Sequence, residues 1–421
     1  MYALIDCNNF YVSSERVFQP YLQNKAGCVL SNNDGCAIAR SQEAKDLGVK
    51  MGTPYFEIRE LKEQGKLWWR SSNYPLYQDM MRRITGIIKE TFPEQEIYSI
   101  DECFCDVSEY KLHDLELLGK TLRETILQCT GIPVCVGVGA TKTLSKIANR
   151  IAKKEKAVHV LNTAYKIDVA LKKTQIGDVW GIGPKYAAML IGKGVNNAFD
   201  FINLPPDFVQ SEMTIVGLRT WKELRGEKCV EMEYETPDKK GISTARSFGH
   251  TETELAPMEE ALATYVANAA LKLRKQNSVC GKIYVFAHTS RFAVRNKIFS
   301  AGVDVKLSVP SNITAELTQY ALNGLRKIYR KGPNYQKVGV YLTDLTPDDQ
   351  VQMALFDVKG GATRAKLAKA TKTIDKLNLL MGKNKVQFGA MGFDQKWIMK
   401  QEYLSKRFTT RIEDIIVVKA Y

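Results

Sequence analysis

Two adjacent acids, Asp101 and Glu102, interrupt the β-prone stretch 97–107 and are the side chains best placed to do chemistry. The alternation around them predicts a hairpin with both carboxylates at its turn. A third acid, Asp6, ends the apolar run that opens the chain. If this run pairs beside the hairpin, three carboxylates converge, and their repulsion is relieved by protons or by bound cations. The alternative is that Asp101 and Glu102 form an ordinary polar turn.

The cation that such a site predicts is Mg²⁺. Oxygen ligands with open positions suit this ion, and a pair of such ions is a common device for in-line phosphoryl transfer. The four histidines are widely spread and the nine cysteines form no CxxC pair, which argues against zinc. An odd, scattered set of cysteines is typical of reduced thiols in a cytosol.

Length and charge bound the possible functions. A chain of 421 residues is long enough for about three or four domains, and its formal charge is +14. This excess of positive charge predicts a polyanionic partner. Nucleic acid is the favoured candidate, and an anionic membrane is the second. No apolar run approaches membrane-spanning length, and Asp6 breaks the opening one. We therefore expect neither signal peptide nor anchor, and a cytoplasmic location.

The elements that position Asp6 also bring aromatic and cationic side chains close to it. A helix start follows Asp6 and carries Tyr11, whose ring beside a nucleotide sugar would exclude a 2′-hydroxyl by bulk; a packing tyrosine is the alternative. Short β segments over 27–39 lead to a predicted helix at 41–47. Arg40 and Lys45 there are candidates for binding a triphosphate, or else are solvated surface residues.

The middle of the chain predicts a palm-like α/β domain and then a helical one. Helical spacing over 77–92 and 115–129 surrounds the acidic hairpin, and 134–139 is a buried strand. The stretch 142–156 then sets six cations against one acid on a helix, with its apolar stripe inward and its cations outward. These cations serve either phosphate binding or solubility.

Residues 176–190 predict a short helix, a Gly-x-Gly turn and a second helix opened by Pro184. Such a helix-hairpin-helix holds a DNA phosphate on its backbone N–H groups without reading a base. Gly181, Gly183 and Lys185 are the candidate contacts. The alternative is an αα-hairpin whose turn simply needs glycine.

The last third predicts a second basic domain and a tail. After a linker at 233–241, the order strand, helix, strand, strand, helix, strand over 242–342 is the split βαβ arrangement. Its basic residues would form an open face for duplex phosphates: Arg246, Arg291, Arg295, Lys297 and Lys306. Segment 359–411 holds thirteen Lys/Arg and three Asp/Glu. An amphipathic helix is predicted there, with Leu367, Ala370, Ile374, Leu377 and Met381 on one face.

In this order the pieces resemble the Y-family translesion DNA polymerases, and more narrowly the UmuC-type catalytic subunit of bacterial DNA polymerase V. The resemblance spans the full length, through residues 6–11, 39–45, 99–102, 142–153, 180–183, 245–249 and 352–356. It implies an α+β multidomain, right-hand fold. The expected parts are a ferredoxin-like palm (1–19 and 77–165), small fingers (20–76), a helical thumb with the helix-hairpin-helix (166–232), the linker (233–241), a ferredoxin-like little finger (242–347), and a clamp-binding peptide with a basic C-terminal tail (348–421).

The resemblance also implies roles for individual residues. Asp6, Asp101, Glu102 and the Cys7 main-chain carbonyl would bind two Mg²⁺ ions, and Tyr11 would be the steric gate against ribonucleotides. Arg40, Lys45 and Lys153 would contact the triphosphate, and Ile38 would lie over the nascent base pair. Many family members have Tyr at the position of Gln42 and Arg at that of Lys45. Lysine is a point charge rather than a bidentate fork, so the triphosphate grip is expected to be weaker.

The function that the resemblance implies is error-prone translesion synthesis in the SOS response. Its substrates would be primer–template DNA and dNTPs, and a sliding clamp would bind Gln352, Met353, Leu355 and Phe356. A UmuD′-type accessory dimer and RecA are implied as partners by resemblance alone. Two other classes remain open, a non-catalytic DNA-binding scaffold and a nucleotide cyclase on a palm-like fold.

Overall fold

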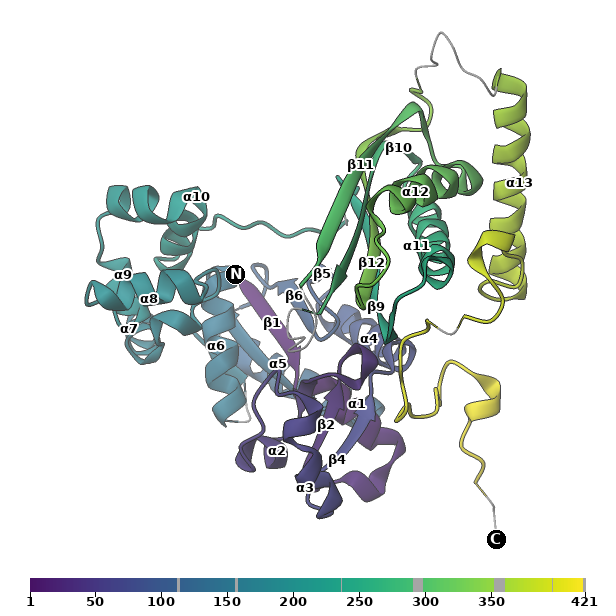
Figure 1. Cartoon of the computed structure of the whole chain (residues 1–421). Coiled ribbons are helices and arrows are strands. Elements are labelled where there is room, and N and C mark those ends of the chain that lie inside the picture. The colour runs from purple at the N-terminus through teal and green to yellow at the C-terminus, as the bar shows by residue number, and fades with distance from the viewer. Residues whose placement is uncertain are drawn as a thin grey trace. The chain divides into compact units, whose positions relative to one another are not determined.

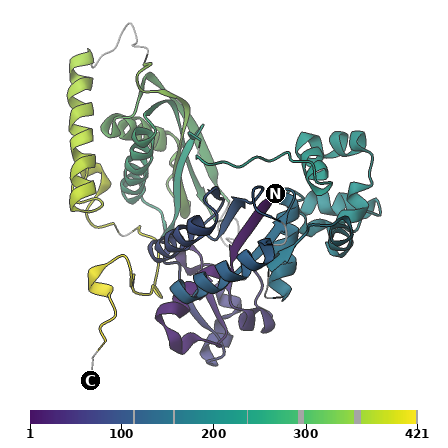
Figure 2. The ribbon, with the colours of Figure 1, turned by 180° about the vertical axis from the view of Figure 1, so that it is seen from behind.

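The computed structural model describes residues 1–418 apart from 112–113, 156–157, 236, 291–297, 352–359 and 396. The chain forms two compact units, Met1–Thr236 with Glu402–Tyr421, and Pro237–Gln401. Both units consist of helices packed with sheets (Figures 1 and 2). Among the described helices, none combines the length and the apolar character that crossing a membrane requires.

The first unit is built on a five-stranded sheet that carries the acids. Its strands, in the spatial order β5-β6-β1-β7-β8, are β5 (Gln95–Ile97), β6 (Glu102–Asp106), β1 (Tyr2–Cys7), β7 (Val134–Gly139) and β8 (Val158–Val160). Helix α4 (Tyr74–Thr91) leads into β5, and α5 (Leu115–Thr130) joins β6 to β7. Both helices lie across one face of the sheet (Figure 2). The predicted hairpin and the ferredoxin-like palm are confirmed.

The opposite face of this sheet is covered by α6 (Lys142–Glu155), which approaches it very closely (Figure 1). Val134, Val136 and Val138 of β7 belong to the core. Their neighbours Gly137 and Gly139 point the other way, because side chains alternate along a strand. A Cβ on Gly137 would lie 2.0 Å from the backbone nitrogen of Asn149. Only glycine therefore lets the helix backbone lie this close to the sheet.

A smaller sheet and a short helix follow β1 in the chain. The sheet has the order β3-β2-β4, with β3 (Ala37–Arg40), β2 (Gly27–Leu30) and β4 (Trp68–Ser71). Helix α1 (Phe10–Phe18) starts directly after the left-handed residue Asn9, at φ 49°. Helix α2 (Gln42–Asp46) is capped by the Ser41 side chain, which accepts a hydrogen bond from the Ala44 N–H. The short helix α3 (Arg59–Glu63) leads back to β4.

The rest of the first unit is mainly helical, and it contains the predicted Gly-x-Gly turn. Its helices are α7 (Ala164–Lys173), the 3₁₀ turn at Ile176–Asp178, α8 (Pro184–Gly192), α9 (Ala198–Ile202) and α10 (Pro206–Leu224). Gly181 has φ 91°, which favours glycine, and its Cβ would lie 2.7 Å from the Thr220 hydroxyl. Gly183 is the residue before α8 and Pro184 is the first in it. The helix, turn and helix are therefore confirmed.

The second unit contains an antiparallel four-stranded sheet with two helices. The elements are β9 (Ile242–Glu252), α11 (Leu255–Lys275), β10 (Ser278–Thr289), β11 (Ser300–Ser311), α12 (Thr314–Ile328) and β12 (Tyr335–Pro347). The order β11-β10-β12-β9 separates each pair of helix-linked strands by one strand, which is the predicted split arrangement. Here the second and fourth strands are central, whereas the first and third (β1 and β6) are central in the palm sheet.

One basic residue of this sheet does not lie on the predicted face. Arg246 is opposite Val338, a core residue beneath the helices. The two-residue period of a strand therefore places Arg246 on the helix-covered side, although it is exposed. The open face instead carries Lys282 and Lys306, which pair across β10 and β11, and the exposed ring of Tyr284. Arg291, Arg295 and Lys297 lie outside the described residues.

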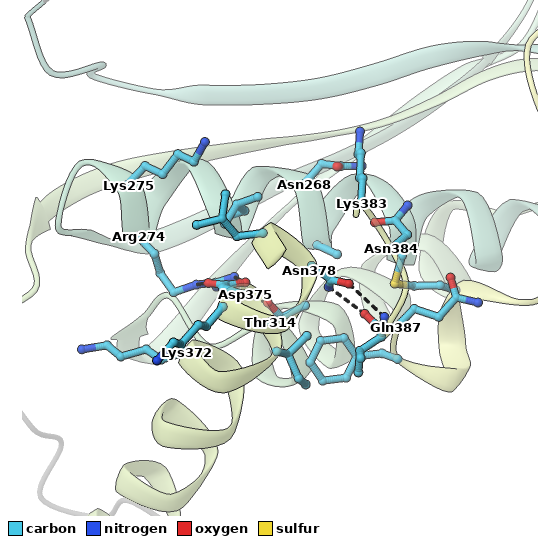
Figure 3. A pocket seen from close by; sticks show the side chains of 18 of the residues that line it. Asn268, Arg274, Lys275, Thr314, Lys372, Asp375, Asn378, Lys383, Asn384 and Gln387 are labelled. Carbon is cyan, nitrogen blue, oxygen red and sulfur yellow. Dashed lines mark hydrogen bonds and ion pairs between the residues drawn. The ribbon is translucent and has the colours of Figure 1, made fainter. Parts of the chain in front are cut away.

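The predicted C-terminal helix is present as α13 (Gly360–Met381), but only part of its predicted apolar face is packed, since Leu367 and Ile374 are half-buried. Arg274 of α11 forms an ion pair with Asp375 at 2.6 Å, and Thr371 is only 3% exposed. Leu377 and Met381 of the predicted apolar face are exposed. A cavity of about 520 Å³ lies between α11, α13 and the turn after α13, where Asn378 pairs with the Val386 backbone (Figure 3).

The tail beyond this helix does not stay with the second unit. Residues from Glu402 onward pack against the first unit. The region 348–421, expected to be one tail, is therefore divided between the two units. Helix α13 and the turn after it are held by polar pairs that the apolar pattern of the sequence does not show.

Candidate active site

The main chain brings the three predicted acids to one edge of the sheet. Asp6, the next-to-last residue of β1, pairs with Glu102, the first residue of β6. The Cys7 N–H donates to the Asp101 carbonyl at 2.9 Å, which fixes the turn against the end of β1. The predicted pairing of the opening strand beside the hairpin is thus confirmed, and Asp101 and Glu102 form more than an ordinary surface turn.

The turn itself is organised by Ser99. Its hydroxyl donates to the Asp101 carboxylate at 2.7 Å and accepts from the Glu102 N–H at 3.1 Å. These bonds orient one acid through its side chain and the other through its backbone. A serine two residues before an acid is a turn signal in the sequence, but its role in orienting the acids needs the structure.

Two lysines of α6 already neutralise two of the acids. Lys153 Nζ lies 2.7 Å from Asp6 Oδ2, and Lys146 Nζ lies 3.0 Å from both carboxylate oxygens of Glu102. The two lysines are seven residues apart, so they share one face of the helix. That face points to the acids. The prediction that the cations of this helix project outward is therefore wrong for Lys146, whereas Lys153 is exposed and still reaches Asp6.

Lys142 departs furthest from that prediction, since it is only 1% exposed. Its ammonium group pairs with buried Glu96 and donates to the Glu231 carbonyl at 2.7 Å. It shares the inward face with Lys146, four residues on. The sequence of α6 predicts a cationic face in solvent. Because α6 approaches the sheet closely at Gly137 and Gly139, its lysines instead neutralise buried acids.

Burial sets the electrostatics of Asp6, which is 5% exposed. Loss of hydration raises the pKa of Asp6 to about 7, although Lys153 opposes the rise, and nearby Glu102 and Asp101 add to it. Even with Lys153 beside it, this carboxyl group is therefore only partly ionised at neutral pH, and a divalent cation would favour its charged form. The oxygen donors here are thus suited to a hard divalent cation.

The side chains themselves are not gathered into a metal cage. Within the described part of the chain, no three His, Cys, Asp or Glu side chains are grouped closely enough to hold a metal ion. Asp6 and Glu102 are drawn to separate lysines, while their backbones lie in register. The expected convergence is therefore shown for the strands and not for the three carboxylate groups.

A cavity of about 250 Å³ lies in front of the acids, and it brings most of the predicted site together. Its lining combines carboxylate, cationic and apolar side chains from β1, α1, β3, α2, the turn before β6 and α6. The predicted residues that line it are Asp6, Cys7, Tyr11, Ile38, Arg40, Lys45, Asp101 and Lys153. Residues not predicted that also line it include Asn9, Met51 and Ile100.

Tyr11 is held firmly at the wall of this cavity. Its ring stacks on Tyr77 with centroids 4.4 Å apart and planes 13° apart, and the Tyr74 ring meets it edge-on at 6.0 Å. Burial raises the pKa of Tyr11 to about 12, so the phenol stays neutral at physiological pH. Tyr11 is therefore both a packing residue and a cavity residue, and the two readings of the sequence are compatible.

The cationic side chains that line the cavity repel one another. Burial first, and then the neighbouring Arg40 and Lys153, lower the pKa of Lys45. Lys45 Nζ donates to the Asn9 side chain at 2.9 Å, and Arg40 donates to the Val49 carbonyl at 2.9 Å. The buried Nε of Arg40 has no partner among the described residues. A polyanion entering here would relieve this repulsion.

The remaining predicted residues lie elsewhere. Gly181, Gly183 and Lys185 belong to the helical part of the first unit, and Arg246 to the sheet of the second. Arg291 lies outside the described residues, and so do Gln352, Met353, Leu355 and Phe356.

Comparison with known proteins matches almost the whole chain. The impB/mucB/samB family matches residues 5–150, its C-terminal domain matches 239–355, and a domain of unknown function matches 368–418. Protein UmuC of Salmonella typhimurium is 40% identical over 424 residues, which is 100% of both chains. DNA polymerase IV of Brucella melitensis is 25% identical, over 92% of this chain and 84% of its own.

The solved structures agree on the fold. A Y-family DNA polymerase chimera of Dbh and Dpo4 matches with a TM-score of 0.64 at 22% identity, over 82% of this chain and 99% of its own. An insertion ternary complex of Dbh DNA polymerase matches with a TM-score of 0.53 at 21% identity, over 82% of this chain and 99% of its own.

The chain thus has the fold of a Y-family DNA polymerase. It has a sheet with acids at adjoining strand ends, then a helical part, and then a second unit with its own sheet. The full-length likeness to UmuC narrows this class further. The chain belongs to the impB/mucB/samB family, and within it is a DNA-directed DNA polymerase of the UmuC type.

The buried pair of Lys142 and Glu96 leads to a prediction about stability. Lys142→Met is expected to lower the free energy of unfolding by about 3–5 kcal/mol, because it leaves Glu96 as an uncompensated buried charge. Denaturant unfolding measures this loss. Lys154→Met changes an exposed lysine of the same helix and is expected to shift stability by less than about 0.5 kcal/mol. Equal, small effects of both substitutions would contradict the buried countercharge.

Proposed function

We propose that the cavity in front of Asp6 and Asp101 is the site where an incoming deoxynucleotide is joined to a primer end. The reaction would be template-directed synthesis past damaged bases, the error-prone translesion synthesis of the SOS response. The observation that carries the proposal is the composition of this one cavity, where carboxylates, three cations and an aromatic wall meet. On this assignment the palm, fingers, thumb and little finger take the limits expected from the sequence.

The acids would hold two Mg²⁺ ions, with ligands from Asp6, Asp101, Glu102 and the Cys7 carbonyl. Bound Mg²⁺ would activate the primer 3′-hydroxyl and stabilise charge on the phosphates. Asp6 supports this fit, because it is buried and its pKa is raised to about 7 even beside Lys153, so that a further cation would favour its ionised form. Lys146 holds the Glu102 carboxylate from α6 in the same way as Lys153 holds Asp6.

The triphosphate would enter on the cationic side of the cavity. Arg40, Lys45 and Lys153 line it and lie close enough that Arg40 and Lys153 lower the pKa of Lys45. Three phosphate groups would turn this repulsion into attraction. Ile38 would lie against the nascent base pair, as the family resemblance implies, and it is one of the apolar side chains that line the cavity.

Primer–template DNA would be held by phosphate contacts from both units. In the first unit the candidates are the backbone N–H groups at the start of α8, after Gly181 and Gly183, with Lys185. In the second unit the open face of the sheet offers Lys282 and Lys306 beside Tyr284. None of these groups is arranged to read base edges, which suits synthesis at any sequence.

A sliding clamp, a UmuD′-type dimer and RecA are the remaining proposed partners. The motive for the clamp is the peptide Gln352–Phe356 of the sequence, which offers an amide and two apolar anchors. The other two come from the family alone. Titrating the purified chain with each partner tests them, and a Leu355→Ala, Phe356→Ala variant that kept full clamp affinity would remove the clamp assignment.

The two other classes explain less of the site. A non-catalytic scaffold gives no reason for acids and cations to share one cavity. A nucleotide cyclase gives no reason for a second basic sheet unit. No observation here favours either class.

The acids give the first test of this function. Asp101→Asn and Glu102→Ala are expected to reduce primer extension at least about 100-fold while DNA affinity is unchanged, because the loss of a metal ligand costs several kcal/mol of transition-state stabilisation. Single-turnover extension with Mg²⁺ and four dNTPs measures the rate. Asp168→Asn, a change in an exposed helical ion pair, is the matched control. Extension by either variant at a tenth of the normal rate or better would refute the metal assignment.

Tyr11 gives the second test. Tyr11→Ala removes the cavity wall, so ribonucleotide insertion is expected to rise by about tenfold or more relative to deoxynucleotide insertion. Separate insertion rates for one rNTP and its dNTP give the ratio. Tyr165→Ala, at a position 78% exposed on α7, should leave the ratio unchanged. An unchanged ratio in Tyr11→Ala would leave this residue with its packing role only.

Salt dependence tests the phosphate contacts. Duplex affinity is expected to fall steeply with salt, and Lys282→Ala or Lys306→Ala should each reduce the slope of log affinity against log salt by about one. Lys327→Ala, on the helix face of the same unit, is the control for general charge. A flat dependence, or strong preference for one DNA sequence, would exclude this mode of binding.

A further inference from the structure

We propose that the segment Glu402–Phe408, called the strap below, positions Tyr11 and thereby sets how strictly the enzyme rejects ribonucleotides. The inference rests on the proposed role of Tyr11 as the sugar gate. The strap belongs to the region matched by a domain of unknown function, residues 368–418. It lies more than 390 residues after Tyr11 in the chain and packs against the same unit.

The strap begins by pairing with the open edge of β4, an edge strand of the three-stranded sheet. The Ser71 N–H donates to the Tyr403 carbonyl at 3.1 Å, and the Tyr403 N–H donates to the Ser71 hydroxyl at 3.0 Å. The Glu402 N–H donates to buried Asp34 at 2.9 Å. Backbone groups at a strand edge are thus satisfied by the returning chain.

Aromatic contacts hold the strap at both ends. The Tyr403 ring meets Trp69 edge-on at 5.6 Å, and Lys62 Nζ lies 3.9 Å from the centroid of the Tyr403 ring. At the other end the Phe408 ring stacks on Phe18, with centroids 4.8 Å apart and planes 7° apart. Phe18 is the last residue of α1, the helix that carries Tyr11.

The polar middle of the strap forms hydrogen bonds with two completely buried side chains. Ser405 Oγ donates to Glu15 Oε1 at 2.9 Å, and Asn73 Nδ2 donates to Ser405 Oγ at the same distance. Glu15 and Asn73 are both 0% exposed. Asn73 also caps α4, because its side chain accepts from the Leu76 N–H. One serine therefore contacts both α1 and the start of α4.

From Glu15 two further contacts lead to the gate. Tyr77 donates its hydroxyl to Glu15 Oε1 at 2.8 Å, and the Tyr77 ring stacks on Tyr11 at 4.4 Å. Gln19 holds the other Glu15 oxygen at 2.9 Å. Burial raises the pKa of Glu15, and the hydrogen bonds from Tyr77 and Ser405 oppose that rise. Ser405 and Tyr77 thus share one carboxylate oxygen, and the position of one depends on the other.

A gate that excludes one hydroxyl group needs its ring fixed to within about 0.5 Å. Tyr11 and Glu15 are four residues apart on α1, so they lie on the same side of that helix. The strap therefore acts on Tyr11 twice, through the orientation of Tyr77 and through the end of α1. A purely structural strap would change stability and leave sugar discrimination alone.

The experiment compares the ribo-to-deoxy insertion ratio in full-length variants on undamaged primer–template. Ser405→Ala and Tyr77→Phe each remove one donor to Glu15, and each is expected to raise the ratio by about threefold or more. Ser405→Thr keeps the hydroxyl and should restore the normal ratio. In a Tyr11→Ala background, Ser405→Ala should add nothing. Ser211→Ala, at an exposed position of α10, is the matched control.

The outcomes separate the strap from the gate. If Tyr11→Ala raises the ratio while Ser405→Ala and Tyr77→Phe do not, the strap inference is overturned and the gate stands. If Tyr11→Ala has no effect, the gate assignment fails, and the strap loses its role with it. A lower melting temperature for Ser405→Ala with a normal ratio would make the strap structural. Should Ser405→Ala not fold, Ser405→Cys, which keeps the size of the side chain and weakens the donor to Glu15, decides in its place, because Tyr77→Phe leaves the strap contacts unchanged.

Discussion

The close approach of α6 to β7 is the constraint on which the candidate site depends. Gly137 and Gly139 leave no side chain between the helix and the sheet, and the Asn149 side chain donates to the carbonyls of Leu4 and Cys135 at 3.0 Å each. This contact ties the helix to β1 and β7 together. The lysines of α6 consequently lie at the strand ends where the acids are, and a longer separation would leave those acids without countercharge.

Charge balance then explains the chemistry that the cavity supports. Asp6 and Glu102 are each matched by one lysine, while Arg40 and Lys45, which also line the cavity, have neutral partners. The carboxylates are thus suited to a cation, and Arg40 and Lys45 to an anion. A metal-bound triphosphate would present both charges, in keeping with the proposed nucleotidyl transfer in this cavity.

The C-terminal region contributes contacts to the unit that contains the site, although it lies far from that unit's other residues in the sequence. Helix α13 is held on the second unit by the Arg274–Asp375 pair, whereas the segment from Glu402 covers polar groups of the first. Glu15, Ser71 and Asn73 are fully buried, and each of them forms a hydrogen bond with that segment. The packing that surrounds Tyr11 is therefore completed by residues from the far end of the chain.

The sequence by itself determined the acidic hairpin, the strand ending in Asp6, the Gly-x-Gly turn and the order of elements in both sheets. These features follow from local periodicity and turn chemistry, which can be recognised in the amino-acid sequence without the structure. It also indicated Tyr11, Arg40 and Lys45 as site residues. It placed Lys142, Lys146 and Arg246 on the wrong faces, because an amphipathic pattern shows where apolar residues lie and does not show which partner a buried charge has. Only the tertiary structure decided that Lys142 and Lys146 face acids, that Ser99 orients the turn, and that Ser405 reaches Glu15. Each of these depends on partners far away in the chain or on how closely two backbones approach, and neither leaves a periodic signal.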